Sequence, residues 1–166
     1  MPAPLFGALV LLLVGAAALG GTPSAAWALA AGATALLLVF QFRLWDDLAD
    51  APLDRVAHPE RHLPRSESAA PFHAALAVTG GVSLLAVFFL SGAAAAAGLL
   101  GANALFAAWY RRTPEKRKRI PGTLLLLAKY PVFVLLLAPA PRDPVLLALA
   151  CAAVYAVACL YEWRTS

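Results

Sequence analysis

The chain has 166 residues, of which 62% are hydrophobic and only 13% are charged. Soluble domains carry roughly twice that charged fraction, so the composition excludes a soluble domain and predicts an integral membrane protein. The net charge of +4 does not predict a nucleic-acid partner, because the basic residues lie in short segments beside apolar blocks and not along one long basic face.

Two apolar blocks open the chain, at about 5–19 and 25–42. A helix needs about 20 apolar residues to cross a bilayer, and both blocks reach or approach that length. No Lys or Arg precedes the first block, so we expect it to be a membrane span and not a signal peptide.

An acidic segment follows directly, with four of the nine carboxylates within nine positions: Asp46, Asp47, Asp50 and Asp54. If the segment is helical, Asp47, Asp50 and Asp54 share one face and can converge on a hard cation. Oxygen ligands alone favour Mg²⁺ or Ca²⁺ over zinc or copper. Pro52 disfavours helix at the preceding residue, which weakens the shared-face argument there. The other interpretation is a polar loop whose charges pair with one another and with water.

Two arginines follow these acids, Arg55 and Arg61. A guanidinium group can hold a phosphate through two parallel hydrogen bonds. Acids together with arginines therefore predict a metal-bridged phosphate ligand at this segment.

Two more apolar blocks, at about 73–90 and 93–109, lead to a second polar segment with six basic residues and one Glu: Arg111, Arg112, Lys116, Arg117, Lys118 and Arg119. Taken alone, this segment is typical of a topology signal in contact with anionic lipid. Beside the acidic segment, a phosphate-binding role is the alternative.

The last two apolar blocks, at about 120–138 and 145–161, complete six expected spans. Lys129 lies inside the fifth, where a charge is costly unless it faces a cavity or a partner. It is a candidate site residue, and the alternative is that it snorkels or pairs with a buried carbonyl. Apart from Lys129, we expect polar residues to be scarce deep in the spans, which argues against a transporter.

The blocks are long, rich in Ala and Leu, and lack the alternation of a barrel strand. The predicted fold class is all-α: a polytopic membrane helical bundle of about six transmembrane helices, forming one domain over residues 1–166. All basic residues except Arg142 and Lys129 then fall on one side of the membrane. By the positive-inside rule, both termini and the acidic segment face the cytoplasm, in the inner membrane if the protein is bacterial.

The order Asp-Asp-x-x-Asp-x-x-x-Asp from Asp46, followed by Pro59-x-Arg61, resembles the first aspartate-rich motif of the UbiA-type intramembrane prenyltransferases. Asp46 stands where that family usually has Asn, and His62 where it usually has a second Pro. Tyr110, followed by basic residues and then by Arg119-Ile120-Pro121-Gly122, resembles the family's tyrosine and Lys/Arg loop.

The resemblance implies Mg²⁺-dependent prenyl transfer from a polyprenyl diphosphate to a lipophilic, often aromatic, acceptor within the membrane. It implies that Mg²⁺ is held by Asp46, Asp47, Asp50 and Asp54, with Asp50 and Asp54 as the catalytic pair. The residues it implies for binding the diphosphate are Arg55, Arg61, Tyr110, Lys116, Lys118 and Arg119, to which we add Lys129.

Members of that family usually have about nine spans and a second aspartate-rich motif, so the resemblance implies a shortened relative of the family. Three hypotheses stay open. In the first, the chain is a prenyltransferase, active alone or as a homo-oligomer, a dimer that completes the site. In the second, it is a noncatalytic relative that binds a lipid diphosphate and serves as a complementary partner subunit. In the third, it is a small membrane scaffold or transporter.

Overall fold

The computed structural model describes residues 3–19, 23–57, 66, 68–112, 120–139 and 143–165. These residues fold into helices, with no strand among them, and the predicted all-α bundle is confirmed. In chain order the helices are α1 (Ala3–Ala18), α2 (Ala25–Ala57), α4 (Ala70–Ser91), α5 (Ala93–Tyr110), α7 (Ile120–Leu127), α8 (Lys129–Leu137) and α9 (Pro144–Thr165).

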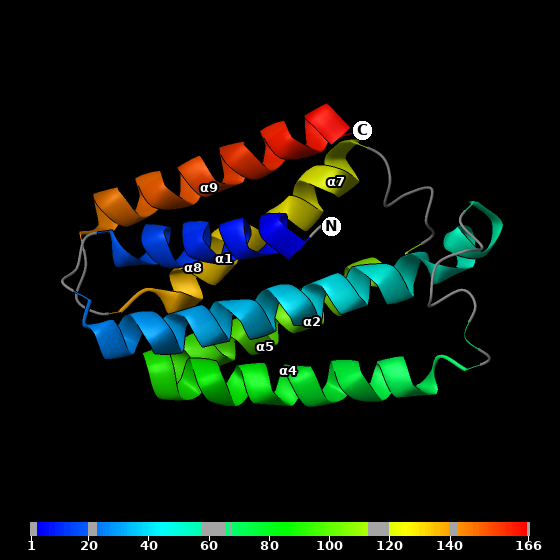
Figure 1. Cartoon of the computed structure of the whole chain (residues 1–166), viewed down its shortest axis with the longest axis horizontal. Coiled ribbons are helices and arrows are strands. Elements are labelled where there is room, and N and C mark those ends of the chain that lie inside the picture. The colour runs from blue at the N-terminus through cyan, green and yellow to red at the C-terminus, as the bar shows by residue number, and fades with distance from the viewer. Residues whose placement is uncertain are drawn as a thin grey trace.

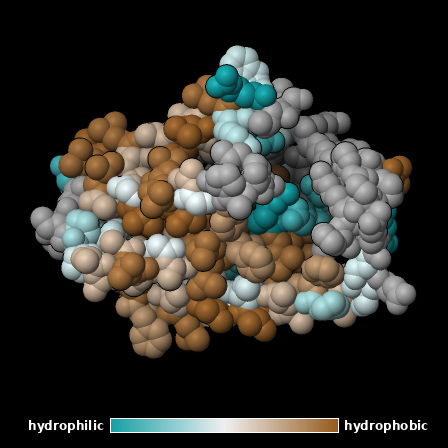
Figure 2. Space-filling model, viewed as in Figure 1, coloured by the Kyte–Doolittle hydropathy of each residue, from teal (hydrophilic) through white to brown (hydrophobic). Residues whose placement is uncertain are grey.

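Four of the described helices, α2, α4, α5 and α9, are long and apolar enough to cross a membrane, while Phe6–Ala18 and Thr123–Leu137 are shorter apolar helices. Large apolar side chains face outward, including Leu29 (78% exposed) and Phe89 (81% exposed). Figure 2 shows one apolar face of the molecule, on which the strongly hydrophilic side chains gather mostly in the half that holds the C-terminus. In water such a surface would drive association, whereas in lipid it is the expected outer surface. The chain is therefore suited to a membrane, as its composition predicted.

The helices run side by side along the long axis of the molecule (Figure 1). Helix α2 packs against α1 and α4, and α4 packs against α5. The short helix α8 lies among the others and contacts α1, α2, α4, α5 and α9. The last turns of α2, the short helix α7 and the C-terminus lie at one end of the bundle, which we call the motif end (Figure 1).

Helix α2 is 33 residues long and continues through the acidic segment with Pro52 inside it. The expected span ended near Phe42, and Pro52 was expected to disfavour helix at Ala51. The structure differs because an internal proline removes only one backbone hydrogen bond, and the rest of this long helix retains its own. Asp46, Asp47, Asp50 and Asp54 therefore lie on a regular helix and not in a loop.

The fifth expected span is interrupted at Ala128, which separates α7 from α8. The Ala128 N–H is shared between the carbonyls of Leu124 and Leu125, each at 3.2 Å. Pro131, inside α8, has no N–H to donate to the carbonyl of Leu127 four residues earlier, so one hydrogen bond of the regular ladder is missing across the junction. The break places Lys129 at the first position of α8.

Candidate functional site

Three polar side chains from three helices meet near the motif end. The Tyr110 hydroxyl, in the last turn of α5, donates a hydrogen bond to one carboxylate oxygen of Asp46 in α2. The Lys129 ammonium, at the start of α8, lies 2.5 Å from the other oxygen. Asp46 is separated by 64 residues from Tyr110 and by 83 from Lys129. We call this group the Asp46 triad.

Aromatic packing underneath and beside the triad fixes its geometry. The Phe42 ring, one helical turn before Asp46, lies 5.2 Å from the rings of both Phe106 in α5 and Phe133 in α8. The Trp45 and Tyr110 rings stack at 5.1 Å with an angle of 34° between their planes. Because α2, α5 and α8 are joined through Phe42, their polar residues one turn further along the bundle come together.

The triad compensates the positive charge of the buried Lys129 ammonium. Its side chain is only 5% exposed, and an isolated ammonium in such a place is strongly unfavourable. The Asp46 carboxylate supplies the opposite charge, and the Tyr130 ring lies 5.6 Å from the ammonium in a cation–π contact. Among the described residues, the partner of Lys129 is therefore a carboxylate and not a carbonyl, and the side chain is buried instead of snorkelling to the membrane surface.

The remaining acids of the motif continue along α2 from the triad. Helical geometry places Asp47, Asp50 and Asp54 on one side of the helix, as the spacing predicted. Asp47 forms an ion pair of 2.9 Å with Arg43, one turn earlier, and both side chains are more than 40% exposed. Asp50 and Asp54 are half-buried. We call this side of α2, from Arg43 to Asp54, the acidic face.

The described side chains contain no group of three or more His, Cys, Asp or Glu residues arranged to hold a metal ion. The donor chemistry of the acidic face nevertheless suits a hard cation. Mg²⁺ is usually held by one or two carboxylates, with water and substrate phosphate oxygens completing its octahedron. Asp50 and Asp54, one helical turn apart, can supply such a pair.

Two cavities open beside the acidic face. A small one of about 40 Å³ is lined by Asp46 and Lys129 and by Arg43 and Tyr130, and is closed by apolar side chains from α1, α2 and α8. That volume holds a water molecule or a single small group. A larger cavity of about 340 Å³ shares Arg43 and Tyr130 with it. The larger one is apolar along α1 and α9 and ends in polar side chains that include Glu162, so it has the character of a site for an amphiphile.

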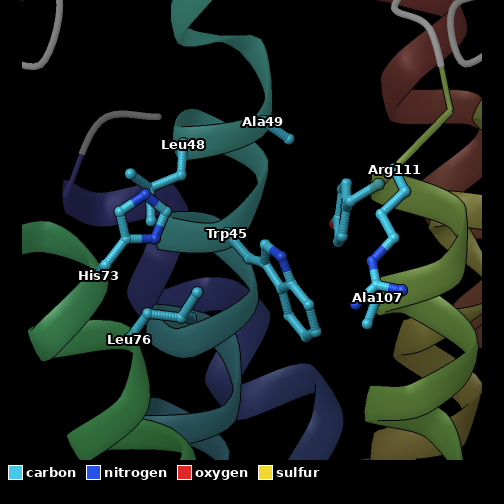
Figure 3. Close-up of a pocket in the computed structure, with 8 residues that line it drawn as sticks. Trp45, Leu48, Ala49, His73, Leu76, Ala107 and Arg111 are labelled. Carbon is cyan, nitrogen blue, oxygen red and sulfur yellow. The ribbon is translucent and has the colours of Figure 1, made fainter. Parts of the chain in front are cut away.

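A third cavity of about 310 Å³ lies between α2, α4 and α5 (Figure 3). Its walls include Trp45 and the Tyr110 ring, with His73 on α4 and Arg111 after α5 on opposite sides. Of the predicted site residues that the structure describes, only Tyr110 lines it. Nothing in the sequence pointed to this cavity, because its walls come from three helices and carry no local motif.

The structure thus joins part of the predicted site. Asp46, Tyr110 and Lys129 meet, and Asp47, Asp50 and Asp54 share the acidic face. Arg55 is exposed near the end of α2. The other predicted phosphate contacts lie outside the described residues: Arg61, Lys116, Lys118 and Arg119.

Polar residues inside the spans are more frequent than we expected. Besides Lys129, three polar residues are buried in the part of the chain that the structure describes: Thr34, Gln41 and Ser83. The Gln41 amide donates a 3.0 Å hydrogen bond to Asn103, which joins α2 to α5. None of these side chains lines the three cavities above. Gln41 therefore joins two helices, whereas the Thr34 hydroxyl donates to the Ala30 carbonyl within α2. The signal that could have revealed these residues is the interruption of apolar blocks by single polar residues.

No protein-family model, curated protein or solved structure matches this chain.

Proposed function

We propose that the chain binds a polyprenyl diphosphate through Mg²⁺ at the acidic face and transfers the prenyl group to a lipophilic, often aromatic, acceptor within the membrane. The observation that carries this proposal is the Asp46 triad. The two segments singled out from sequence, the aspartate motif and the tyrosine before the basic loop, are in direct contact although 64 residues separate them. If the resemblance of the two segments to the family's motifs were due to chance, there would be no reason for them to meet in the fold.

The acidic face supplies the residues for the polar head of such a ligand. Asp50 and Asp54 are the carboxylates that we assign to the metal, because they are one helical turn apart on the acidic face of α2. Mg²⁺ held there supplies charge neutralisation for a departing diphosphate. Arg55, next to Asp54, adds a guanidinium group that can bind a phosphate oxygen.

The larger cavity supports a lipophilic substrate. It lies against α1 and α9, where Leu9, Leu12, Val154 and Val157 form apolar walls, and it reaches Arg43 on the acidic face. An amphiphile would match this lining, with its charged head near Arg43 on α2 and its apolar chain against α1 and α9. In the proposed orientation, the acidic face and both termini face the cytoplasm, following the distribution of basic residues.

The test is Mg²⁺-dependent binding and consumption of a labelled prenyl diphosphate by the purified protein in detergent or liposomes. Asp50→Asn and Asp54→Asn each remove one carboxylate charge and should lower binding at least tenfold. The matched control is Asp143→Asn, because Asp143 caps the N-terminus of α9, where its carboxylate accepts a 2.8 Å hydrogen bond from the Val145 N–H, and Asn retains that role.

Three results separate the hypotheses. Binding with turnover, lost in the Asp50 and Asp54 variants only, supports the transferase. Mg²⁺-dependent binding without turnover selects a noncatalytic lipid-diphosphate binder or a partner subunit. If the parent protein binds no prenyl diphosphate, both are wrong and a scaffold or transporter is left.

A further inference from the structure

We propose that Lys129 is the permanent counter-ion of Asp46, and that Asp46 is a positioning residue that holds Tyr110 and Lys129 in place and does not ligate the divalent ion. The counter-ion assignment stands on the contacts alone. Only the statement about the metal rests on the proposed function, and it removes Asp46 from the ligand set that the motif implied.

The first argument is the use of the carboxylate. One oxygen of Asp46 accepts from the Tyr110 hydroxyl and the other from the Lys129 ammonium. Because each oxygen already accepts from a donor, a metal ion bound at Asp46 would have to share an oxygen with Tyr110 or Lys129 or displace one of them, and beside Lys129 it would meet a second positive charge. Displacing Lys129 would leave a buried ammonium, only 5% exposed, without its opposite charge.

The second argument is the charge around the small cavity, which is the open space beside Asp46. Of its described lining residues, Arg43 and Lys129 are cationic and Asp46 alone is anionic. The other lining side chains are aromatic or aliphatic and offer no second carboxylate. Arg43 is already paired with Asp47, so a divalent cation entering this space would find one carboxylate, Asp46, whose charge is already compensated by Lys129. The space therefore favours water or an anionic oxygen over a metal ion.

The third argument is the position of the other acids. Asp50 and Asp54 lie one and two turns further along α2, so the helix itself carries them away from Lys129. The motif therefore divides into an inner carboxylate that fixes three helices and outer carboxylates that face the ligand.

A double-mutant cycle tests the counter-ion assignment without any metal. Thermal unfolding in detergent with EDTA is measured for Asp46→Asn, Lys129→Met and the double variant. Each single variant should lose stability because it leaves one buried charge unpaired, and the double variant should recover more than half of the larger shift in melting temperature. The matched control is the cycle of Arg43→Gln with Asp47→Asn, an exposed pair on the same helix that should show almost no coupling.

Losses that simply add in the Asp46 and Lys129 cycle would overturn the assignment. If neither single variant folds and the double variant does, the coupling is shown in its strongest form. Lys129→Arg retains the positive charge and should melt closer to the parent than Lys129→Met does.

Mn²⁺ binding followed by electron paramagnetic resonance tests the second half of the proposal. The Asp46→Asn/Lys129→Met variant should bind Mn²⁺ within about twofold of the parent, whereas Asp50→Asn should bind at least tenfold more weakly. A loss in the double variant as large as that of Asp50→Asn would make Asp46 a ligand and overturn the proposal. If the parent binds no Mn²⁺, the metal site of the proposed function is wrong, and the thermal cycle alone decides the role of Lys129.

Discussion

Asp46 and Asp47 are neighbours in the chain, yet they form two different kinds of ion pair. Asp46 reaches inward to a buried lysine from another helix, 83 residues away. Asp47 reaches along its own helix to Arg43, and both partners are more than 40% exposed. The rotation of about 100° between consecutive helical residues is enough to separate a structural pair from a surface pair. Acidic residues that are neighbours in sequence therefore need not have one common role. The variants below should show different losses of unfolding free energy for the buried and the exposed pair.

The largest effect is expected from Lys129→Leu. It removes the ammonium that is paired with the Asp46 carboxylate, whose side chain is only 20% exposed, and breaking a buried ion pair typically costs about 3–5 kcal/mol of unfolding free energy. Arg43→Leu removes the cation of the exposed pair and should cost less than about 1 kcal/mol. Unfolding of both variants in detergent, followed by circular dichroism, measures the difference. Equal losses of unfolding free energy in the two variants would show that the Lys129–Asp46 and Arg43–Asp47 pairs contribute equally to stability.

Tyr110→Phe should have the second largest effect. It retains the ring stacked on Trp45 but removes the hydroxyl that donates to Asp46, and a hydrogen bond to a charged group contributes about 1.5–3 kcal/mol. Tyr155→Phe is the control, since its hydroxyl donates to the neutral Leu124 carbonyl at 3.1 Å. The same unfolding measurement should show a smaller loss for Tyr155→Phe, and the reverse order would contradict a charged acceptor at Tyr110.

Gln41→Leu probes a neutral buried pair on the same helix. Gln41 is 2% exposed and joins α2 to α5 through Asn103, while its carbonyl oxygen has no hydrogen-bond partner among the described residues. Interhelical hydrogen bonds in membrane proteins contribute about 0.6 kcal/mol on average and at most about 1.7. The loss should therefore fall between those of the charged triad and of the surface pair. A loss as large as that of Lys129→Leu would mean that burial, and not charge, determines the energetics.

The sequence predicted the apolar helices and the common side of Asp47, Asp50 and Asp54, but not the ion pair between Lys129 and Asp46. Apolar blocks of membrane-span length appear as helices because no other local structure satisfies their backbone in lipid. The spacing of Asp47, Asp50 and Asp54 translates directly into a common side once α2 is regular. Local rules did not predict that α2 continues past Pro52. They consider the one hydrogen bond that a proline removes, but not the hydrogen bonds that the rest of a 33-residue helix retains.

The contact of Lys129 with Asp46 was beyond local reasoning for another reason. A lone charge in a span predicts that a partner exists, but it does not say which of several carboxylates is the partner. That choice depends on the turn at Ala128 and on the packing of Phe133 against Phe42, which set the rotation of α8 about its axis. The family resemblance implied a diphosphate-binding role for Tyr110, but neither the resemblance nor any spacing in the chain predicted its hydrogen bond to Asp46.

The smallest loss of unfolding free energy is expected from Asp47→Asn, which removes one charge of the exposed pair with Arg43. An exposed pair four residues apart on a helix contributes about 0.3–0.5 kcal/mol, and salt screens it. The difference between parent and Asp47→Asn should therefore shrink in 1 M NaCl, where the Debye length is about 3 Å. The corresponding difference for Asp46→Asn should persist at that salt concentration, because ions cannot enter around a lysine that is 5% exposed. If Asp46→Asn loses its effect in salt as Asp47→Asn does, then Asp46 is accessible to ions from solution, and the division of the acidic segment into an inner and an outer part does not hold.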